Sequence, residues 1–379
     1  MTSLAPRLRL RSAMAGTLRE RVWNLADRTA LRLATPLVPA DYLDVIDPLL
    51  SRADLRGRIV GIRPETRDAA TLVIKPGRGW RPHVPGQYVR VGVDVDGVRL
   101  WRAYSLTSRK DRRDGCFTIT VKAIDGGVVS NHLVRSAAVG TVIQLEQAGG
   151  DFTLGDQPPA KILFVTAGSG ITPVMGMLRN MAGVGVGAGA RDIVVVHSAP
   201  TPDAVIFGGE LRMLDRQRRI RLVERHTDLD GVLDADRLAD LIPDFADRHT
   251  WACGPAGLLD VIETHWSASG IAGQLHIERF RPAVIDTGEG GAGGAVTFAK
   301  TGAVVDIEGS ATLLQTGEAA GVLMPSGCRM GICFGCVVPL RHGAVRDLRN
   351  GELTIATDGD DVNIQTCVSA VVGACELDV

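Results

Sequence analysis

The stretch Lys161-Ile-Leu-Phe-Val-Thr-Ala-Gly-Ser-Gly-Ile-Thr-Pro173 indicates how the middle of the chain folds. Its apolar run is typical of a buried parallel strand, and Gly168 and Gly170 permit a tight turn from that strand into a helix. Pro173 suits the first position of the helix, where a missing N–H costs little. Because free N–H groups at such a helix start bind phosphate, the stretch predicts a dinucleotide-binding unit.

The segment that follows repeats this order of strand and helix, with apolar runs at Ile193–Val196 and Ile220–Val223 separated by helical patterns. The alternation predicts a doubly wound parallel α/β sheet. Later, Cys253-Gly254-Pro255 ends another strand. Because residue 173 is Pro, the loop differs from the G-x-G-x-x-G of generic dinucleotide-binding dehydrogenases. The alternative is that these residues only form turns of an α/β domain.

Short β-rich runs separated by Gly, Pro and Asp extend from about residue 55 to 155, which is typical of an antiparallel barrel or sandwich. One run ends in Arg102-Ala-Tyr-Ser105, and Gly126-Gly-Val-Val-Ser130 follows. In this order the motifs resemble the ferredoxin–NADP reductase superfamily, and the resemblance implies a flavin: the Arg can pair with its diphosphate, the Tyr can cover its ring, and the Ser can approach its N5 edge. A helix start at the second motif would bind another phosphate, which favours FAD over FMN. Each residue alone has an ordinary alternative: Arg102 fits a surface charge, Tyr104 fits an aromatic of the barrel, and Gly126-Gly127 fits a turn.

The C-terminal part contains Cys328-Arg-Met-Gly-Ile-Cys333-Phe-Gly-Cys336, and Cys367 follows further on. This spacing is typical of a [2Fe–2S] cluster, whose two irons need four thiolates from one wrapped loop and one distant segment. A zinc site is the alternative, although zinc loops usually supply paired ligands with short gaps. We therefore expect the metal ligands Cys328, Cys333, Cys336 and Cys367. On residue type alone, Cys116, Cys253 and Cys375 are expected to be ordinary buried thiols.

Composition narrows the class of protein. With 379 residues, 45% hydrophobic and 22% charged, the chain fits a globular protein of two to three domains. The net charge of −1 argues against a dedicated nucleic-acid binder. Since the sequence shows no membrane-length apolar run and no secretory signal, we expect a cytoplasmic protein.

Charge is distributed unevenly along the chain. Residues 1–35 carry seven Arg and two acidic residues, a net charge of +5, whereas residues 295–379 carry a net charge of −5. The basic segment fits an amphipathic helix that either contacts the inner membrane face or packs on the body of the protein.

In their order, these flavin and phosphate motifs resemble the ferredoxin–NADP reductase superfamily, and the cysteine segment resembles plant-type ferredoxins. Glu278-Arg-Phe280 matches the nicotinamide side of that superfamily. The start of the chain, Asp41–Pro48, is similar to actinobacterial reductases that serve acyl-CoA desaturases. The resemblance implies the catalytic residues Ser105, Thr172 and Cys253. It also implies cofactor contacts from Arg102, Tyr104, Ser105, Gly127, Val128, Ser130, Gly168, Gly170, Thr172, Gly254, Pro255 and Phe280.

The resemblance predicts a multidomain fold with an antiparallel β-barrel flavin domain, a doubly wound α/β nicotinamide domain and an α+β β-grasp ferredoxin domain. The expected limits are a basic N-terminal extension (1–54), an FAD-binding barrel (55–157), an NAD(P)-binding domain (158–283), a Gly-rich linker (284–294) and a [2Fe-2S] ferredoxin domain (295–379).

The same resemblance predicts the activity. NADPH or NADH would give a hydride to FAD, and single electrons would pass through the [2Fe-2S] cluster to a protein acceptor. The expected acceptor is a membrane fatty-acyl-CoA desaturase. The alternatives are a soluble oxygenase or P450 system, or a flavin reductase whose iron–sulfur domain is a regulatory sensor.

Coenzyme preference stays open in the sequence. No Arg follows His197, where NADPH-preferring relatives commonly have one for the 2′-phosphate, so Ser198 and Arg225 are expected to take that role.

Overall fold

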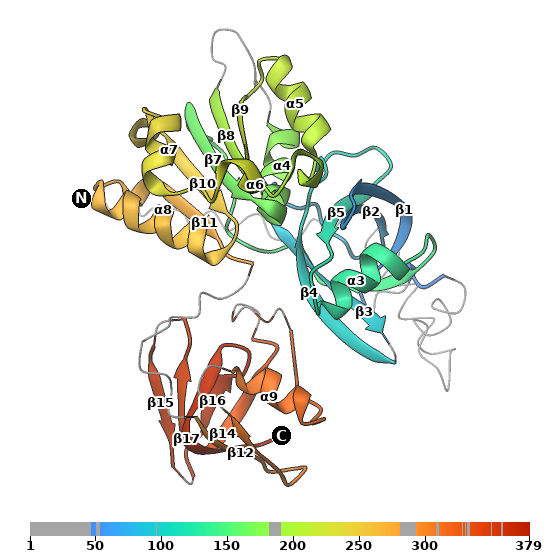
Figure 1. Cartoon of the computed structure of the whole chain (residues 1–379). Coiled ribbons are helices and arrows are strands. Elements are labelled where there is room, and N and C mark those ends of the chain that lie inside the picture. The colour runs from blue at the N-terminus through green and yellow to red at the C-terminus, as the bar shows by residue number, and fades with distance from the viewer. Residues whose placement is uncertain are drawn as a thin grey trace, which may run out of the picture.

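The computed structural model describes residues 47–50, 54–95, 97–181, 191–280, 293–307, 311–327, 329, 331, 334–349, 351–357 and 359–379. These residues form three sheets that follow one another along the chain (Figure 1). Most of the predicted basic extension and of the Gly-rich linker lies outside the described residues. No helix within the described ranges is long and apolar enough to cross a membrane.

The first sheet is a six-stranded antiparallel barrel in the order β4-β3-β6-β1-β2-β5. Its strands are β1 (Arg56–Thr66), β2 (Ala69–Pro76), β3 (Tyr88–Val95), β4 (Val98–Ser105), β5 (Phe117–Lys122) and β6 (Val142–Leu145). A bridge between Leu106 and Ile119 joins the two edge strands and closes the barrel. The short helix α3 (Val128–Asn131) lies between β5 and β6 in the chain and buries Val129 in the barrel core.

The end of the predicted N-terminal extension contacts this barrel. Arg58 of β1 donates from Nη2 to Asp47 at 2.8 Å. The Arg78 amide donates to the Leu49 carbonyl at 3.3 Å. These contacts attach residues 47–50 to the barrel surface.

The second sheet is parallel throughout, in the order β11-β10-β7-β8-β9. Its strands are β7 (Lys161–Ala167), β8 (Asp192–Ala199), β9 (Arg221–His226), β10 (His249–Cys253) and β11 (Leu275–Glu278). The helices of this part are α4 (Ile171–Asn180), α5 (Gly208–Arg216), α6 (Thr227–Asp230), α7 (Ala235–Leu241) and α8 (Ala256–Ala268).

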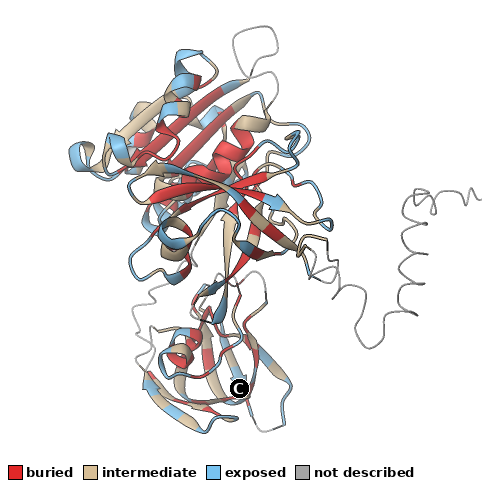
Figure 2. Ribbon diagram, turned by 90° about the vertical axis from the view of Figure 1, so that its right-hand side faces the viewer, coloured by how far each residue is buried: buried red, intermediate tan, exposed pale blue. Residues whose placement is uncertain are grey.

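Alternate strand residues of this sheet bury two separate layers. Helices α4 and α5 cover the face that carries Phe164 and Val195, and α7 and α8 cover the face that carries Val165 and Val196. Figure 2 shows buried residues concentrated along these strands. The strand order reverses between β7 and β10, so the expected ligand crevice lies at their carboxyl ends.

The sequence prediction placed the start of α4 two residues too late. The helix begins at Ile171 after a 3₁₀ turn over Gly168–Gly170. Pro173 is therefore its third residue rather than its first. This position is tolerated because the first turn of a helix has no intrahelical acceptor for its N–H groups.

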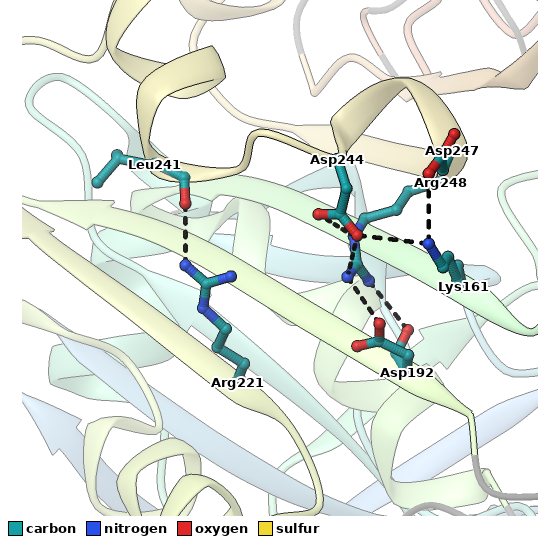
Figure 3. Close-up of polar contacts among 7 residues, drawn as sticks. All are labelled: Lys161, Asp192, Arg221, Leu241, Asp244, Asp247 and Arg248. Atoms are coloured by element: carbon teal, nitrogen blue, oxygen red, sulfur yellow. Dashed lines mark hydrogen bonds and ion pairs between the residues drawn. The ribbon is translucent and has the colours of Figure 1, made fainter.

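A buried arginine fixes the opposite, amino-terminal end of the same sheet. Arg248 is only 4% exposed, and its Nη2 donates to Asp192 at 2.7 Å and to Asp244 at 2.8 Å (Figure 3). Lys161 lies 3.6 Å from Asp244. This network ties the first residues of β7 and β8 to the residue just before β10, away from the ligand crevice.

Helix α4 packs directly against the barrel. A Cβ on Gly176 would lie 2.2 Å from the Leu106 carbonyl oxygen, so glycine is required for this approach. Asn180 donates from Nδ2 to the Ser108 carbonyl at 2.9 Å, and its Oδ1 accepts from the Lys110 amide at 2.8 Å. These contacts pack the middle and the end of α4 against the chain that follows β4.

The third sheet is mixed, because β12 pairs with β17 in parallel and the other neighbours are antiparallel. Its strands are β12 (Gly294–Phe298), β13 (Ala303–Ile307), β14 (Val337–Asp347), β15 (Leu353–Ala356), β16 (Val362–Gln365) and β17 (Ser369–Leu377). Helix α9 (Leu313–Ala319) starts with a capping box of Thr312 and Gln315 and packs its leucines on this sheet. The predicted α+β fold of this C-terminal domain is confirmed.

Candidate functional site between the barrel and the parallel sheet

A cavity of about 200 Å³ lies where the barrel meets the parallel sheet. It is lined by Tyr88, Arg102, Ala103, Tyr104, Ser105, Thr120, Lys122, Ile124, Gly127, Val129, Ser130, Ser169, Thr172, Glu278 and Phe280. Residues from both halves of the predicted site therefore face one space. Seven of the expected contacts line it: Arg102, Tyr104, Ser105, Gly127, Ser130, Thr172 and Phe280.

Strand β4 supplies the barrel side of the cavity. Ser105 is buried at its end, and burial raises the pKa of the Tyr104 hydroxyl well above its usual range. Arg102 donates from Nη1 to the Trp101 carbonyl at 2.7 Å. Burial, together with repulsion from Arg329, lowers the pKa of the Arg102 guanidinium. A partly buried cation beside a second cation suits an anionic ligand, because such a ligand would restore the lost solvation.

The turn before α3 supplies the next part of the wall. Gly127 is the N-cap of that helix, and Ser130 donates from Oγ to the Gly127 carbonyl at 3.1 Å. The Ile124 amide donates to the Ser130 oxygen at 3.3 Å. The hydroxyl of Ser130 thus holds the turn together, whereas Val128 is 51% exposed and does not line the cavity.

The turn after β7 supplies the opposite wall. Gly168 adopts a φ of 54°, which glycine accepts without strain. A Cβ on Gly170 would lie 2.0 Å from the Cys253 carbonyl oxygen, so the turn touches the end of β10. Thr172 donates from Oγ1 to the Ser169 carbonyl at 2.9 Å, and both side chains line the cavity.

The ends of β10 and β11 complete this wall. Cys253 is fully buried and does not line the cavity, and burial raises the pKa of its thiol well above the usual range. Glu278, opposite Cys253 in the strand register, does line it. Burial, and then the charge of Asp151, raise the pKa of Glu278 to about 7. The motif Glu278-Arg-Phe280 predicts no role for Glu278, although its position at a strand end beside the topological switch is a signal for one.

The remaining nicotinamide-side residues lie outside the cavity. Gly254 packs against Ala167 of β7, where an added Cβ would lie 3.3 Å from the Ala167 Cβ, and Pro255 is the N-cap of α8. Ser198 and Arg225 are register partners at the carboxyl ends of β8 and β9. Arg225 donates from Nη2 to the Asp230 carbonyl at 3.0 Å.

Two of the four predicted metal ligands are described, and the structure brings them together. Cys336 and Cys367 are both buried, and a hydrogen bond between their side chains helps lower the pKa of Cys336 to about 6. The Thr366 amide donates to the Cys336 carbonyl at 3.2 Å, and Leu314 of α9 donates to the Thr366 carbonyl at 3.0 Å. Cys328 and Cys333 lie outside the described residues.

The described parts of the cysteine loop have the tight backbone that wrapping a cluster requires. Arg329, Gly331 and Phe334 all have positive φ, at 61°, 74° and 55°. Arg349 donates from Nη1 to the Gly331 carbonyl at 2.8 Å, and Gln365 donates to the same oxygen at 2.9 Å. Two side chains from outside the loop therefore hold it in place.

Glu318 and Arg329 connect this loop to the flavin-side cavity. Arg329 donates from Nη1 to Glu318 of α9 at 2.7 Å. Both charges act on Arg102, which lines the cavity: Arg329 lowers its pKa and Glu318 raises it. The residue next to Cys328 in the sequence thus lies close to the edge of the cavity.

These residues fit the groups that the motifs imply. Arg102 and the N-terminus of α3 present positive charge at one cavity, which suits the diphosphate of FAD. Two buried, hydrogen-bonded thiols from a loop and a distant segment suit half the ligand set of a [2Fe–2S] cluster. The fold and the site define a flavin and iron–sulfur oxidoreductase with a nicotinamide-binding domain.

Comparison with known proteins agrees with this class. Residues 82–154 match the oxidoreductase FAD-binding domain family, and residues 296–372 match the 2Fe-2S iron-sulfur cluster binding domain family. An NADPH oxidoreductase of Mycobacterium tuberculosis is 46% identical over 97% of this chain and 96% of its own length. The glycine betaine monooxygenase reductase subunit of Pseudomonas aeruginosa is 29% identical over 78% of this chain and 86% of its own.

A solved phthalate dioxygenase reductase has the same fold, with a TM-score of 0.58 over 86% of this chain and 98% of that chain, at 23% identity. The chain belongs to the ferredoxin-reductase-type NAD(P)H oxidoreductases that combine an FAD-binding domain with a C-terminal [2Fe-2S] domain. It transfers electrons from NAD(P)H through FAD to the [2Fe-2S] centre.

Proposed function

We propose that this protein is the reductase component of an oxygenase system, delivering single electrons from its [2Fe-2S] domain to a separate oxygenase. The observation that carries the proposal is the electrostatic influence on Arg102, at the cavity, of the ion pair between Glu318 and Arg329, which is beside Cys328 in the sequence. This arrangement serves an acceptor that takes electrons from the iron–sulfur domain. The relative from Pseudomonas aeruginosa, named as a monooxygenase reductase subunit, supports the same choice.

The chain's own residues would prepare the cleft for hydride transfer. Bound FAD supplies a carrier that accepts two electrons together and releases them singly. Arg102 would hold its diphosphate, Tyr104 would cover the ring, and Ser105 would contact the reacting edge. Thr172, on the turn after β7, would position the nicotinamide against that edge.

The domain limits at residues 157 and 294 and the four cysteine ligands belong to the same proposal. So does NADPH as the preferred coenzyme, with Ser198 and Arg225 near the 2′-phosphate. Their position at the carboxyl ends of adjacent strands supports this choice.

An exposed aromatic side chain supports docking of a protein acceptor at the cysteine loop. Phe334 lies between Cys333 and Cys336 in the sequence and is 68% exposed. Loss of an interfacial aromatic anchor weakens protein–protein contacts. Phe334→Ala should therefore slow reduction of a protein acceptor while ferricyanide reduction is unchanged.

The experiment that tests the function reconstitutes the full chain with candidate acceptors. NADPH should bleach the flavin, and electrons should then reach a Rieske-type or P450 oxygenase preparation. Support of acyl-CoA desaturation in membranes, with no oxygenase supported, would instead favour the desaturase that the start of the sequence predicts. Ferricyanide reduction without transfer to any protein would favour the sensor alternative.

The role of the basic N-terminal segment is tested in the same preparations. Residues 1–46 lie outside the described residues, and the membrane contact predicted for them rests on their basic, amphipathic sequence. Deletion of residues 1–40 should abolish sedimentation with anionic vesicles if they bind membrane. Loss of bound FAD in the deletion would indicate packing on the reductase.

A further inference from the structure

Four buried threonines form a hydrogen-bonded ladder inside the barrel wall. Thr71 of β2 lies opposite Thr120 of β5 in the strand register, and their hydroxyl oxygens are 2.7 Å apart. Thr107 contacts Thr118 at 2.7 Å and Thr120 at 3.4 Å. None of the four is more than 4% exposed. Buried hydroxyls need such partners, but this ladder also joins two different cavities.

One end of the ladder opens into the flavin-side cavity. Thr120 lines that cavity. Because the bridge between Leu106 and Ile119 is antiparallel, Ser105 lies directly across from Thr120. Residues opposite each other on one face of a strand pair have neighbouring side chains. The Thr120 hydroxyl is therefore next to the residue proposed to contact the reacting edge.

The other end opens into a second cavity of about 430 Å³. Thr71 donates from Oγ1 to Glu65 at 2.6 Å, and both residues line this cavity. Exposed Arg63 and Arg109 are also part of its lining, so it communicates with solvent. The charged groups around Glu65 there are Arg63, Arg109, Arg112, Arg179, Glu210 and Arg219.

The reaction of the proposed function leaves one proton in the cleft per turnover. A hydride carries two electrons and one proton from the nicotinamide. The electrons leave singly through an iron–sulfur centre, which transfers electrons without protons. One proton for each hydride must therefore leave a cleft that the barrel lines on one side and the parallel sheet on the other.

We propose that Thr120, Thr71 and Glu65 conduct this proton from the flavin cleft to solvent. The inference rests on the proposed hydride and electron transfer. The hydrogen bonds already point outward: Thr71 donates to the carboxylate, so its oxygen is free to accept from Thr120. The Thr120 oxygen then has lone pairs free to accept from the cleft. Thr107 and Thr118 form a longer branch from Thr120 to the same second cavity, which Thr118 also lines, and its first step of 3.4 Å from Thr120 to Thr107 is longer than the 2.7 Å step to Thr71.

The test uses the full-length holoprotein in weak buffer with a pH-indicator dye. NADPH first reduces the enzyme, and excess ferricyanide then withdraws the electrons in a stopped-flow instrument. Thr71→Val removes the middle hydroxyl without changing the side-chain volume. We expect proton release to slow about tenfold while hydride transfer changes by less than about twofold, since a positioned proton-transfer group is lost.

Two matched variants separate conduction from packing. Thr71→Ser restores a hydroxyl and should restore the release rate. Thr118→Val removes an equally buried hydroxyl from the longer branch and should behave like the wild type, because the shorter route through Thr71 stays intact. In redox-induced infrared difference spectra, Glu65→Gln should remove a carboxyl band that the wild type shows.

Other outcomes overturn the inference. Proton release at the wild-type rate in Thr71→Val, or an equal slowing in Thr118→Val, would mean that the hydroxyls only tie the strands together. So would a Thr71→Val protein whose hydride transfer slows as much as its proton release. Failure of NADPH to bleach the flavin in the wild type would instead refute the proposed function.

Discussion

Cys253 and Glu278 are register partners at the carboxyl ends of β10 and β11, where the parallel sheet meets the flavin-side cavity. The thiol is fully buried behind the turn that contains Gly170, and the carboxyl group reaches the cavity. The charge of Glu278 adds to the burial that raises the pKa of Cys253. The pair places a titratable group, rather than the thiol itself, at the cavity wall.

Glu278 should make stability depend on pH near neutrality. Its pKa is raised from 4.5 to about 7 in the folded chain, so the folded state holds this proton more tightly than the unfolded state. The resulting stabilisation is complete below pH 4.5 and is lost as pH rises through 7. Its size is of the order of 2 kcal/mol, discounted for partial exposure. Urea unfolding at a series of pH values measures it.

Glu278→Gln is the control for this dependence, because it removes the titration and keeps a similar shape. The difference in free energy of unfolding between wild type and variant should change sharply between pH 4.5 and 7. A difference that is constant with pH would contradict the raised pKa.

Arg102→Ala should weaken FAD binding. The guanidinium at the cavity would no longer pair with the diphosphate, a charge-assisted contact worth about 1.5–3 kcal/mol. Fluorescence titration of the apoprotein with FAD gives the affinity. Arg99→Ala on the same strand is the matched control, because Arg99 is paired with Asp94 at 2.8 Å outside the cavity. Equal losses in both variants would refute the role of Arg102.

Cys336→Ser should remove the cluster and keep the flavin. A hydroxyl is a poor ligand for a centre that selects soft thiolates. Iron analysis and the visible spectrum measure the loss, and Cys375→Ser serves as the control because Cys375 is a buried thiol in the same core. Zinc in place of two irons per chain would overturn the [2Fe-2S] assignment of these cysteines.

Much of the architecture could be predicted because it depends on local signals. The apolar run that begins at Lys161, the glycines after it and the hairpin before α9 are each determined within a few residues. The start of α4 was misplaced because Pro is tolerated throughout a first helical turn, so it does not mark a single position.

Contacts between distant segments could not be predicted in this way. The residues around Gly176 in the sequence do not show that this position must be glycine. The requirement comes from the Leu106 carbonyl oxygen, which belongs to a distant segment. In the same way, the sequence suggested a catalytic role for Cys253, but only the packing of Gly170 against it shows that the thiol is enclosed. The threonine ladder likewise depends on the register between strands, which the alternation of apolar and polar residues along each strand does not determine by itself.

Arg225→Ala should raise the KM for NADPH about tenfold or more and leave the KM for NADH nearly unchanged, since only the 2′-phosphate would lose a charged partner. Steady-state ferricyanide reduction with each coenzyme measures the ratio. Arg221→Ala, at the other end of β9, is the control, because Arg221 donates to the Leu241 carbonyl at 2.9 Å (Figure 3). Equal effects on both coenzymes would place Arg225 outside the phosphate site.

The two glycines of the turn after β7 should respond differently to alanine. Gly168 has a φ of 54° but open space around its Cβ position, so Gly168→Ala should cost only about 1–2 kcal/mol of backbone strain. Gly170 has an ordinary φ of −60°, but its added methyl group would lie 2.0 Å from the Cys253 carbonyl oxygen. Because the three atoms nearest to that methyl group are all backbone atoms of Cys253 and Gly254, the turn must move away from β10, and overpacking of this kind costs about 1–3 kcal/mol or more.

Gly170→Ala should therefore also weaken nicotinamide binding, because the displaced turn carries Thr172 with it. Urea unfolding and NADP⁺ titration of both variants measure the two effects. The expected result is a strained but competent Gly168→Ala protein and a Gly170→Ala protein that has lost both stability and affinity. Equal coenzyme affinity in the two would show that the approach of the turn to Cys253 does not shape the binding site.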